Sequence, residues 1–317
     1  MAAEQTIPTF QNQISRTSLF DEKFSLRIGC FNIANAKIDG EYKPLSNRKQ
    51  KIIDSINRAG LDVLCLLEAN RPSKDMIFAE LAAEIEKQTG LKFVALHNVN
   101  ASANAFGKAL FVNPVRAQIV QSSQHWLSGK KFTAPYTSPG WGSSYVLATI
   151  HPVKLVSVDS LGQIDILPMV IRDKEIEVGF VHMPMSLKDR MDAIRQIADM
   201  RQKPDLFMGD WNTFPDIGGP KMISTMVDGG WIRQLPEDTI TFKAFPHDLI
   251  AKPASFAQEI NPESKIVETK EDGTLMVQFA SLLDHVFTSH DSFQISTGIE
   301  MDEETSDHAL VYAIVDF

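Results

Sequence analysis

Polar side chains stand where short apolar segments of this sequence end. The stretch "LFMGDWN" places Asp210 and Asn212 two positions apart, directly after an apolar run that ends at Gly209. Side chains two positions apart on a strand point to the same side, so we expect Asp210 and Asn212 to face one cleft. Trp211 then points the other way, into packing, with ligand stacking as the alternative. Gly209 is expected to allow a close approach of the backbone.

The same arrangement recurs along the chain. Asn32 ends "SLRIGCFN", Glu68 ends "DVLCLLE" and His182 ends "EIEVGFVH". Three further polar residues stand inside or just before later strand-like segments: Asp284, Asp307 and His308. Each residue taken alone has an ordinary explanation as a turn cap or a structural histidine. Because rigid strand ends present side chains to clefts, the whole set instead predicts one shared site.

Carboxylates, carboxamides and imidazoles together are suited to phosphate ester hydrolysis. Mg²⁺ takes a few carboxylate oxygens and keeps several waters, and it polarises phosphoryl oxygens. A carboxylate can orient the attacking water, while amide or imidazolium donors hold the phosphate. The residue types therefore predict a metal-dependent phosphoester hydrolase.

Hydrophobic periodicity indicates the elements that would position these residues. Strands are predicted at 25–32, 62–68, 91–97, 108–113, 206–212, 281–289 and 308–317, with an antiparallel run within 140–182. One helix is predicted from a cap at Ser46 to a stop before Gly60, a second at 74–89, and a third at 186–202. At the start of the third, Ser186 and Asp189 are typical of a capping box. Helices that fall between strands favour an α/β protein in which helices cover packed sheets.

Composition narrows the class of protein. The 317 residues carry 31 basic and 40 acidic side chains, a net charge of -9, which argues against broad attraction to phosphate backbones but leaves a nuclease open. Cys30 and Cys65 lie in apolar stretches and are expected to be buried thiols, with no disulfide framework or zinc spacing. Residues 1–24 lack the order of a secretory signal and are interpreted as a polar extension. A cytoplasmic protein without a membrane span is expected.

The order of motifs resembles the metal-dependent endonuclease/exonuclease/phosphatase superfamily. The resemblance rests on six blocks in family order: "GCFNIAN", "DVLCLLEAN", "VGFVHMP", "FMGDWNTFPD", "LLDHVFTS" and "TSDHALVYAIVDF". It implies a four-layer α/β sandwich of the deoxyribonuclease I type, in which two mixed β-sheets pack face to face with helices outside. It also implies that residues 25–317 form a single catalytic domain.

The resemblance implies a metal group and a group that acts on water and phosphate. The metal group is Glu68 as principal ligand, Asn32 beside it and Asp307 ligating or approaching the ion, which is expected to be Mg²⁺ with Mn²⁺ as a substitute. In the second group Asp210 orients or deprotonates water, and Asn212 holds water or a phosphate oxygen. His182 contacts the phosphate, and His308 donates to it while being oriented by Asp284. The general base is either Asp210 or the Asp284/His308 pair.

One position departs from the family pattern, and the substrate stays open. Leu67 stands where the superfamily usually has glutamine, so a hydrogen bond that supports Glu68 is expected to be missing or replaced. Nucleic acid is the first substrate hypothesis, an inositol phosphate or sphingomyelin-like headgroup the second, and a catalytically inactive binding module the third. Candidate phosphate or base contacts are Lys130, Lys131, Arg190, Arg195, Arg201, Phe132, Tyr136, Trp141 and Tyr145.

Overall fold

The structure is a computed structural model of the chain. Two main β-sheets make up most of the part that it describes. It describes residues 24–33, 37–38, 41–42, 45–69, 76–98, 107–127, 144–160, 163–183, 187–213, 218–243, 250–252, 265–269, 275–291, 293–302, 305–306 and 308–317.

The first sheet is mixed and built around strand β1. Its spatial order is β18 (Gln294–Glu300), β19 (Leu310–Asp316), β1 (Ser25–Asn32), β4 (Val63–Ala69), β6 (Gly107–Val112) and β5 (Lys92–Asn98). β1 runs parallel to β4 and antiparallel to β19. The end of β1 therefore lies beside the end of β4 and beside the start of β19.

The second sheet is also mixed and repeats this arrangement. Its order is β12 (Ile232–Arg233), β17 (Asp284–Thr288), β11 (Leu206–Asp210), β10 (Ile176–His182), β8 (Ser144–Ser160) and β7 (Ala117–Trp126), with β9 (Gln163–Val170) paired to β8. β10 and β11 are parallel, while β17 and β8 run antiparallel to them. Strand ends of β10 and β11 thus meet the strand starts of β17 and β8 at one edge.

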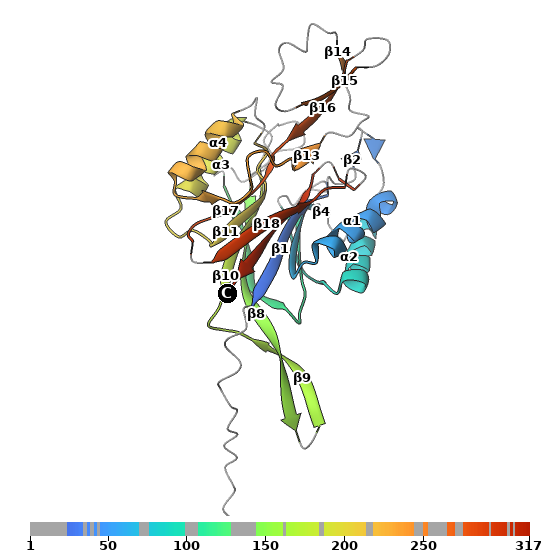
Figure 1. The fold of residues 1–317 in the computed structure, drawn as a ribbon, viewed down its shortest axis with the longest axis vertical. Helices are drawn as coiled ribbons and strands as arrows, with labels where there is room; N and C mark the ends of the chain where they lie inside the picture. Colours follow the sequence, from blue (N-terminus) through green and yellow to red (C-terminus); the bar gives the residue numbers. More distant parts are fainter. Residues whose placement is uncertain are drawn as a thin grey trace, which may run out of the picture.

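Helices cover the outer face of each sheet. α1 (Leu45–Ala59) and α2 (Met76–Thr89) lie on the first sheet, and α3 (Leu187–Ala198) and α4 (Gly219–Asp228) lie on the second (Figure 1). Three apolar clusters match this layering, because one fills the space between the sheets and the other two lie beneath the helix pairs. The predicted four-layer α/β sandwich is confirmed.

Two additions extend beyond the sandwich at opposite ends. The β8–β9 hairpin projects from one end, and a small sheet of β13 (Phe242–Lys243), β14 (Ile250–Lys252), β15 (Lys265–Thr269) and β16 (Leu275–Ser281) lies at the other (Figure 1). A short ladder pairs β2 (Lys37–Ile38) with β3 (Glu41–Tyr42). Within the described residues, no helix is both long enough and apolar enough to span a bilayer.

The structure corrects several predicted boundaries. α1 begins at Leu45, so Ser46 belongs to its first turn and is not its cap, and α3 ends at Ala198 instead of reaching 202. Ser186 lies outside the described residues. Helix α4 was not predicted, and neither were strands β2, β3, β7, β12 to β16 and β18, of which β18 alternates polar and apolar residues only weakly. Cys30 and Cys65 are buried free thiols, as expected.

Candidate active site

Alternate residues of the central strands face the space between the two sheets, and at one edge these inward positions become polar. On β1, Leu26, Ile28 and Cys30 belong to the core between the sheets, and the next inward residue is Asn32. On β11, Leu206 and Met208 are followed in the same way by Asp210, since strand side chains alternate with period two. We call the inward polar residues at this edge the polar layer: Asn32, Lys108, Ser144, His182, Asp210 and Asp284.

Asp210 is the centre of the site. Its Oδ2 accepts a hydrogen bond from Asn32 Nδ2 at 3.0 Å, and it lies 3.5 Å from His182 Nε2 and 3.7 Å from His308 Nε2. The same Asn32 nitrogen donates to Glu68 Oε1 at 3.2 Å, and His182 Nε2 lies 3.6 Å from that oxygen. Two carboxylates from different sheets therefore converge on the same two nitrogen donors.

His308 is oriented by Asp284. Asp284 Oδ2 lies 3.0 Å from His308 Nδ1, which leaves Nε2 directed toward Asp210. The backbone nitrogen atoms of Leu283 and Asp284 both donate to Thr241 Oγ1, at 3.0 and 2.9 Å, so the hydroxyl of Thr241 fixes the start of β17. Since Asp284 begins β17 beside the end of β11, the antiparallel register brings it to Asp210.

A backbone irregularity presents Glu68. The register between β4 and β6 shifts between Leu67 and Ala69, and Glu68 between them has φ 59, a conformation that is uncommon for residues with a side chain. The bulge turns Glu68 to the site edge, while Leu67 stays fully buried in the core between the sheets. Local strain at a carboxylate of this kind is typical of functional sites.

The turn after β11 depends on Gly209. A Cβ atom there would lie 2.2 Å from the carbonyl oxygen of Val181, and the residue has φ +136. Asn212 then closes the turn, because its backbone nitrogen donates to Asp210 Oδ1 at 2.9 Å and its Nδ2 donates to Met183 O at 2.7 Å. Trp211 is fully buried and packs against aromatic rings of the second sheet, which confirms packing over ligand stacking.

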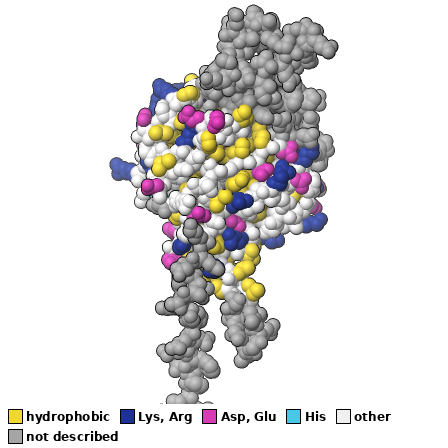
Figure 2. Space-filling model, in the orientation of Figure 1, with side chains coloured by type: hydrophobic (Ala, Val, Ile, Leu, Met, Phe, Trp, Pro, Cys, Tyr) yellow, Lys and Arg dark blue, Asp and Glu magenta, His cyan; other side chains and the backbone are white. Residues whose placement is uncertain are grey.

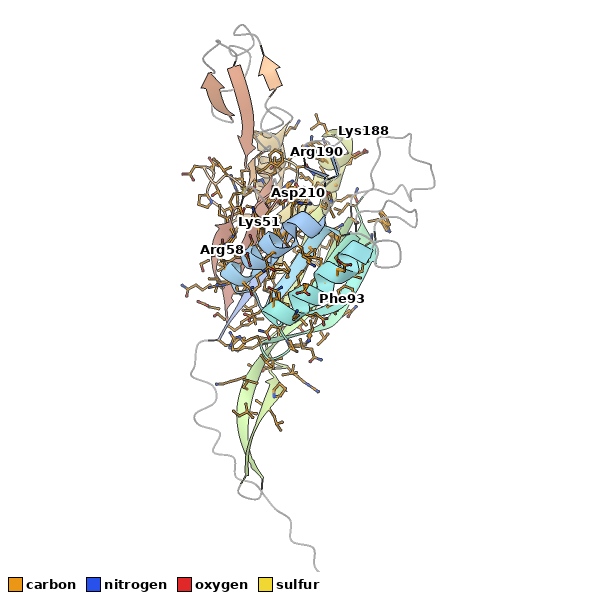
Figure 3. The ribbon with its side chains drawn as sticks, turned by 90° about the vertical axis from the view of Figure 1, so that its right-hand side faces the viewer. Lys51, Arg58, Phe93, Lys188, Arg190 and Asp210 are labelled. Carbon is orange, nitrogen blue, oxygen red and sulfur yellow. The ribbon has the colours of Figure 1, made fainter. Side chains whose placement is uncertain are left out.

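Arg190 supports this turn from behind. It is fully buried on α3, and its Nη1 donates to the backbone oxygen of Asn212. In Figure 3 Arg190 and Asp210 lie near each other in the upper part of the body. The sequence suggested a surface contact with phosphate for Arg190. That interpretation is wrong, because the guanidinium lies in the interior and is bound to the turn.

Burial governs the protonation of the site. Desolvation lowers the pKa of His182 to about 4 even though Asp210 beside it favours the charged form. Burial also raises the pKa of Asp210, against the stabilising effect of His308. His182 is thus neutral at neutral pH, and its contribution to the site is that of a neutral ring.

The donor atoms fit a divalent cation in two overlapping groups. Glu68 and Asp210 offer carboxylate oxygens on either side of Asn32 Nδ2, and carboxylate oxygens are the ligands that Mg²⁺ prefers. Asp210, Asp284 and His308 also offer ligand atoms that lie within 4.8 Å of one another. In this second group the His308–Asp284 hydrogen bond uses one carboxylate oxygen, and in the first group Asn32 Nδ2 donates to one oxygen of each carboxylate.

Some candidates are not brought to the site or lie outside the described residues. Asp307, Lys130, Lys131, Phe132, Tyr136 and Trp141 lie outside the part of the chain that the structure describes. Tyr145 stacks on His125 and packs against Phe207, so it belongs to the second sheet. Arg195 lies on the exposed side of α3, where it pairs with Asp192.

Within the polar layer, sequence reasoning did not assign Ser144 to the site, nor its hydrogen-bond partner Lys108. Lys108 is 2% exposed, and its Nζ donates to Ser144 Oγ at 2.9 Å across the two sheets. A signal was present, because in "GKALFVN" the positions 108, 110 and 112 share one face of the strand. A charged residue on the same strand face as two core residues indicates either the edge of the sheet or a functional site.

Comparison with solved structures agrees with this fold. Solved structures similar to the chain include an endonuclease/exonuclease/phosphatase from Bacteroides vulgatus, with a TM-score of 0.57, 16% identity and coverage of 92% of this chain and 99% of that one. D. rerio TDP2, complexed with single strand DNA product, gives a TM-score of 0.54 at 11% identity, covering 92% and 99%. The mannosyl-6-phosphatase Bt3783 from Bacteroides thetaiotaomicron gives 0.51 at 16%, covering 92% and 100%. A comparison with curated sequences found no significant match.

A deoxyribonuclease I-like sandwich with a buried Asp/Asp/His group at one edge of its sheets defines a phosphoester hydrolase. The profile of the Endonuclease/Exonuclease/phosphatase family matches residues 29–308. The chain therefore belongs to that family.

Proposed function

We propose that the protein is a Mg²⁺-dependent phosphodiesterase that hydrolyses phosphoester bonds in DNA or RNA, with Mn²⁺ able to replace Mg²⁺. The observation that carries the proposal is the convergence of Asn32, His182 and His308 on a single oxygen of Asp210, beside the carboxylate of Glu68. A buried carboxylate with several polar neighbours and a raised pKa is suited to accept a proton from water.

The residues divide the work of hydrolysis between them. Glu68 and its neighbours would hold a divalent cation, which would polarise the phosphoryl oxygens and offset the charge that develops on the leaving oxygen. Asp210 orients the attacking water and accepts its proton. His308, held by Asp284, donates to the phosphate as negative charge develops on it. His182 contacts the phosphate through its neutral ring, and Asp307 is proposed to complete the metal group.

Two positions carry more than one proposed role. The Nδ2 of Asn212 is bound to Met183 O, so Asn212 in this arrangement fixes the turn that aims Asp210. Its contact with water or phosphate remains a proposal. The Asp284/His308 pair is the alternative general base, because the carboxylate beside Nδ1 would strengthen the basicity of Nε2.

Nucleic acid is favoured as substrate by the structural neighbour TDP2, whose structure contains single strand DNA product. Charge limits the kind of contact, since the net charge is -9 and the face shown in Figure 2 intersperses acidic and basic side chains of the described residues. Binding through a few phosphates close to the site fits this surface better than wrapping of a long duplex.

A small phosphate ester is the second candidate. The mannosyl-6-phosphatase neighbour shares the fold over 92% of this chain, which favours a sugar phosphate, inositol phosphate or lipid headgroup in the same site. Such an enzyme would release phosphate from these compounds and leave oligonucleotides intact. A binding module without turnover is the third candidate.

One experiment separates the three candidates. Purified protein is incubated with labelled single-stranded and duplex DNA, RNA, 5′-tyrosyl oligonucleotide, sugar phosphates and inositol phosphates, with Mg²⁺, Mn²⁺ or chelator. The expected result is metal-dependent cleavage of an oligonucleotide that is abolished in Glu68→Gln. The Asp210→Asn variant should lose about 10²–10⁴-fold in kcat. Unchanged cleavage by Asp210→Asn would show that another group activates the water.

A further inference from the structure

Lys108 occupies a position that a stability argument does not explain. Its ammonium is buried between the sheets, and within the described part of the chain its hydrogen-bond partner is the neutral hydroxyl of Ser144. An ammonium that loses water without gaining a carboxylate destabilises the folded state, and apolar replacement of such a group is often neutral or stabilising. A residue kept at this cost needs a reason outside stability.

Strand register places Lys108 against the active site from both sheets. In the first sheet, Lys108 on β6 is opposite Leu67 on β4, the residue next to Glu68. In the second sheet, its partner Ser144 on β8 is opposite His182 on β10. The Lys108–Ser144 hydrogen bond therefore joins the sheets within the same layer that holds Asn32, His182 and Asp210.

The charge of Lys108 reaches the site. Its Nζ donates to Ser144 Oγ at 2.9 Å, and Ser144 is directly opposite His182 in the antiparallel pair of β8 and β10. Burial lowers the pKa of Lys108 to about 8, so the side chain is charged in most molecules at pH 7. In a low-dielectric core this charge is weakly screened.

We propose that Lys108, held by Ser144, is a positioning residue of the active site that supplies a fixed positive charge behind His182 for an anionic phosphoryl group. Leu67, opposite Lys108 on β4, is aliphatic and offers no polar atom at this depth of the core. The charge favours the bound phosphate and the additional negative charge of the transition state. This inference rests on the proposed phosphoester hydrolysis.

A serine nucleophile activated by the lysine is the competing interpretation of the pair. Ser144 is fully buried. An attacking hydroxyl must come within about 3–3.5 Å of the reacting atom, and a hydroxyl enclosed between two sheets gives no substrate that access. The geometry supports an electrostatic role and not covalent catalysis.

The test compares Lys108→Met, which keeps the length and removes the charge, with Lys108→Arg and Ser144→Ala. Calorimetry measures the affinity for inorganic phosphate in the presence of Mg²⁺. Steady-state kinetics on the best phosphoester give kcat and KM, and thermal unfolding gives Tm. Lys108→Met is expected to raise Tm while weakening phosphate binding and lowering kcat/KM by about tenfold each. Lys108→Arg should recover part of the phosphate affinity, and Ser144→Ala should weaken it with the charge retained.

The matched control is Lys203→Met. Lys203 donates to the backbone oxygen of Gly229 and lies over Trp231, away from the polar layer. Its replacement by methionine removes one positive charge, as Lys108→Met does. It should leave phosphate affinity unchanged. The inference is overturned if Lys108→Met binds phosphate as tightly as the wild-type protein does. If Lys108→Met does not fold, an unchanged phosphate affinity of Ser144→Ala overturns it instead. Failure of the wild-type protein itself to bind phosphate would also overturn it. Absence of hydrolysis by a wild-type protein that binds phosphate would instead reject the proposed function.

Discussion

Replacing Gly209 with alanine tests the backbone geometry on which the site depends. The added Cβ would lie 2.2 Å from Val181 O, whereas ordinary contacts begin at 3.4 Å. Strands β10 and β11 would have to separate by about 1 Å, because close-packed interiors leave no room to absorb the overlap. The φ of +136 adds strain for any side chain.

The magnitude follows from these two contributions. Backbone strain and overpacking together are expected to lower the free energy of unfolding by about 2–6 kcal/mol. For a domain of this size that corresponds to a fall in Tm of roughly 3–10 °C. The same movement shifts His182 relative to Asp210, which are paired across β10 and β11. A displacement of this kind should lower kcat by about 10²-fold.

Urea unfolding and steady-state kinetics measure both effects, and Gly90→Ala is the matched control. Gly90 also has a positive φ, of +76, but a Cβ there meets no atom within 4 Å. Its substitution should cost about 1–2 kcal/mol from strain alone and leave kcat unchanged. If Gly209→Ala were no more destabilised than Gly90→Ala and kept full activity, the close approach of the two strands could not be what aims Asp210.

Three further substitutions address separate features. Asp284→Asn should lower kcat by about 10²-fold or more, since Nδ1 of His308 loses its carboxylate partner. A pH–rate profile measures this effect, and a profile identical to that of the wild-type protein would count against a role for the Asp284–His308 pair. His285 is buried with its pKa lowered to about 3, so the unfolded chain binds the proton first. Stability is therefore complete above about pH 6.5 and is lost as pH falls toward 3, by about 2 kcal/mol at pH 5. Urea titrations at pH 7 and 5 should show this loss in wild type and a smaller one in His285→Gln. Arg190→Met should lower the free energy of unfolding by about 2 kcal/mol or more and reduce activity, whereas Arg195→Met on the exposed side of α3 should change neither.

Local pattern in the sequence was enough for helices α1, α2 and α3, for the central strands of both sheets and for the main candidates of the site. Period-two alternation placed Asp210 and Trp211 on opposite faces, and the structure agrees because burial of one face specifies strand orientation. Asn32, Glu68 and His182 were found for a similar reason, since each follows an apolar run. The weakly patterned last third was harder to interpret, and α4, β12 to β16 and β18 were missed there.

Contacts between distant strands needed the tertiary structure. Nothing in the separate segments specifies that Asn32 donates to Asp210, because that contact depends on which strands are neighbours and in which direction they run. The pairing of Asp284 with His308 was expected only from the family resemblance, and the structure supplies its geometry. Arg190 shows the limit most clearly, since on a helix pattern a long cation is expected at the surface, yet the packing of α3 buries it against the turn after β11.

The sequence by itself determined the residue types, the strand periodicity and the chemistry that those residues are able to perform. Only the tertiary structure decided that Lys108 and Ser144 join the two sheets behind His182. The physical reason is that side-chain direction is a local property of a strand, whereas the meeting of two inward faces is set by the packing of whole sheets.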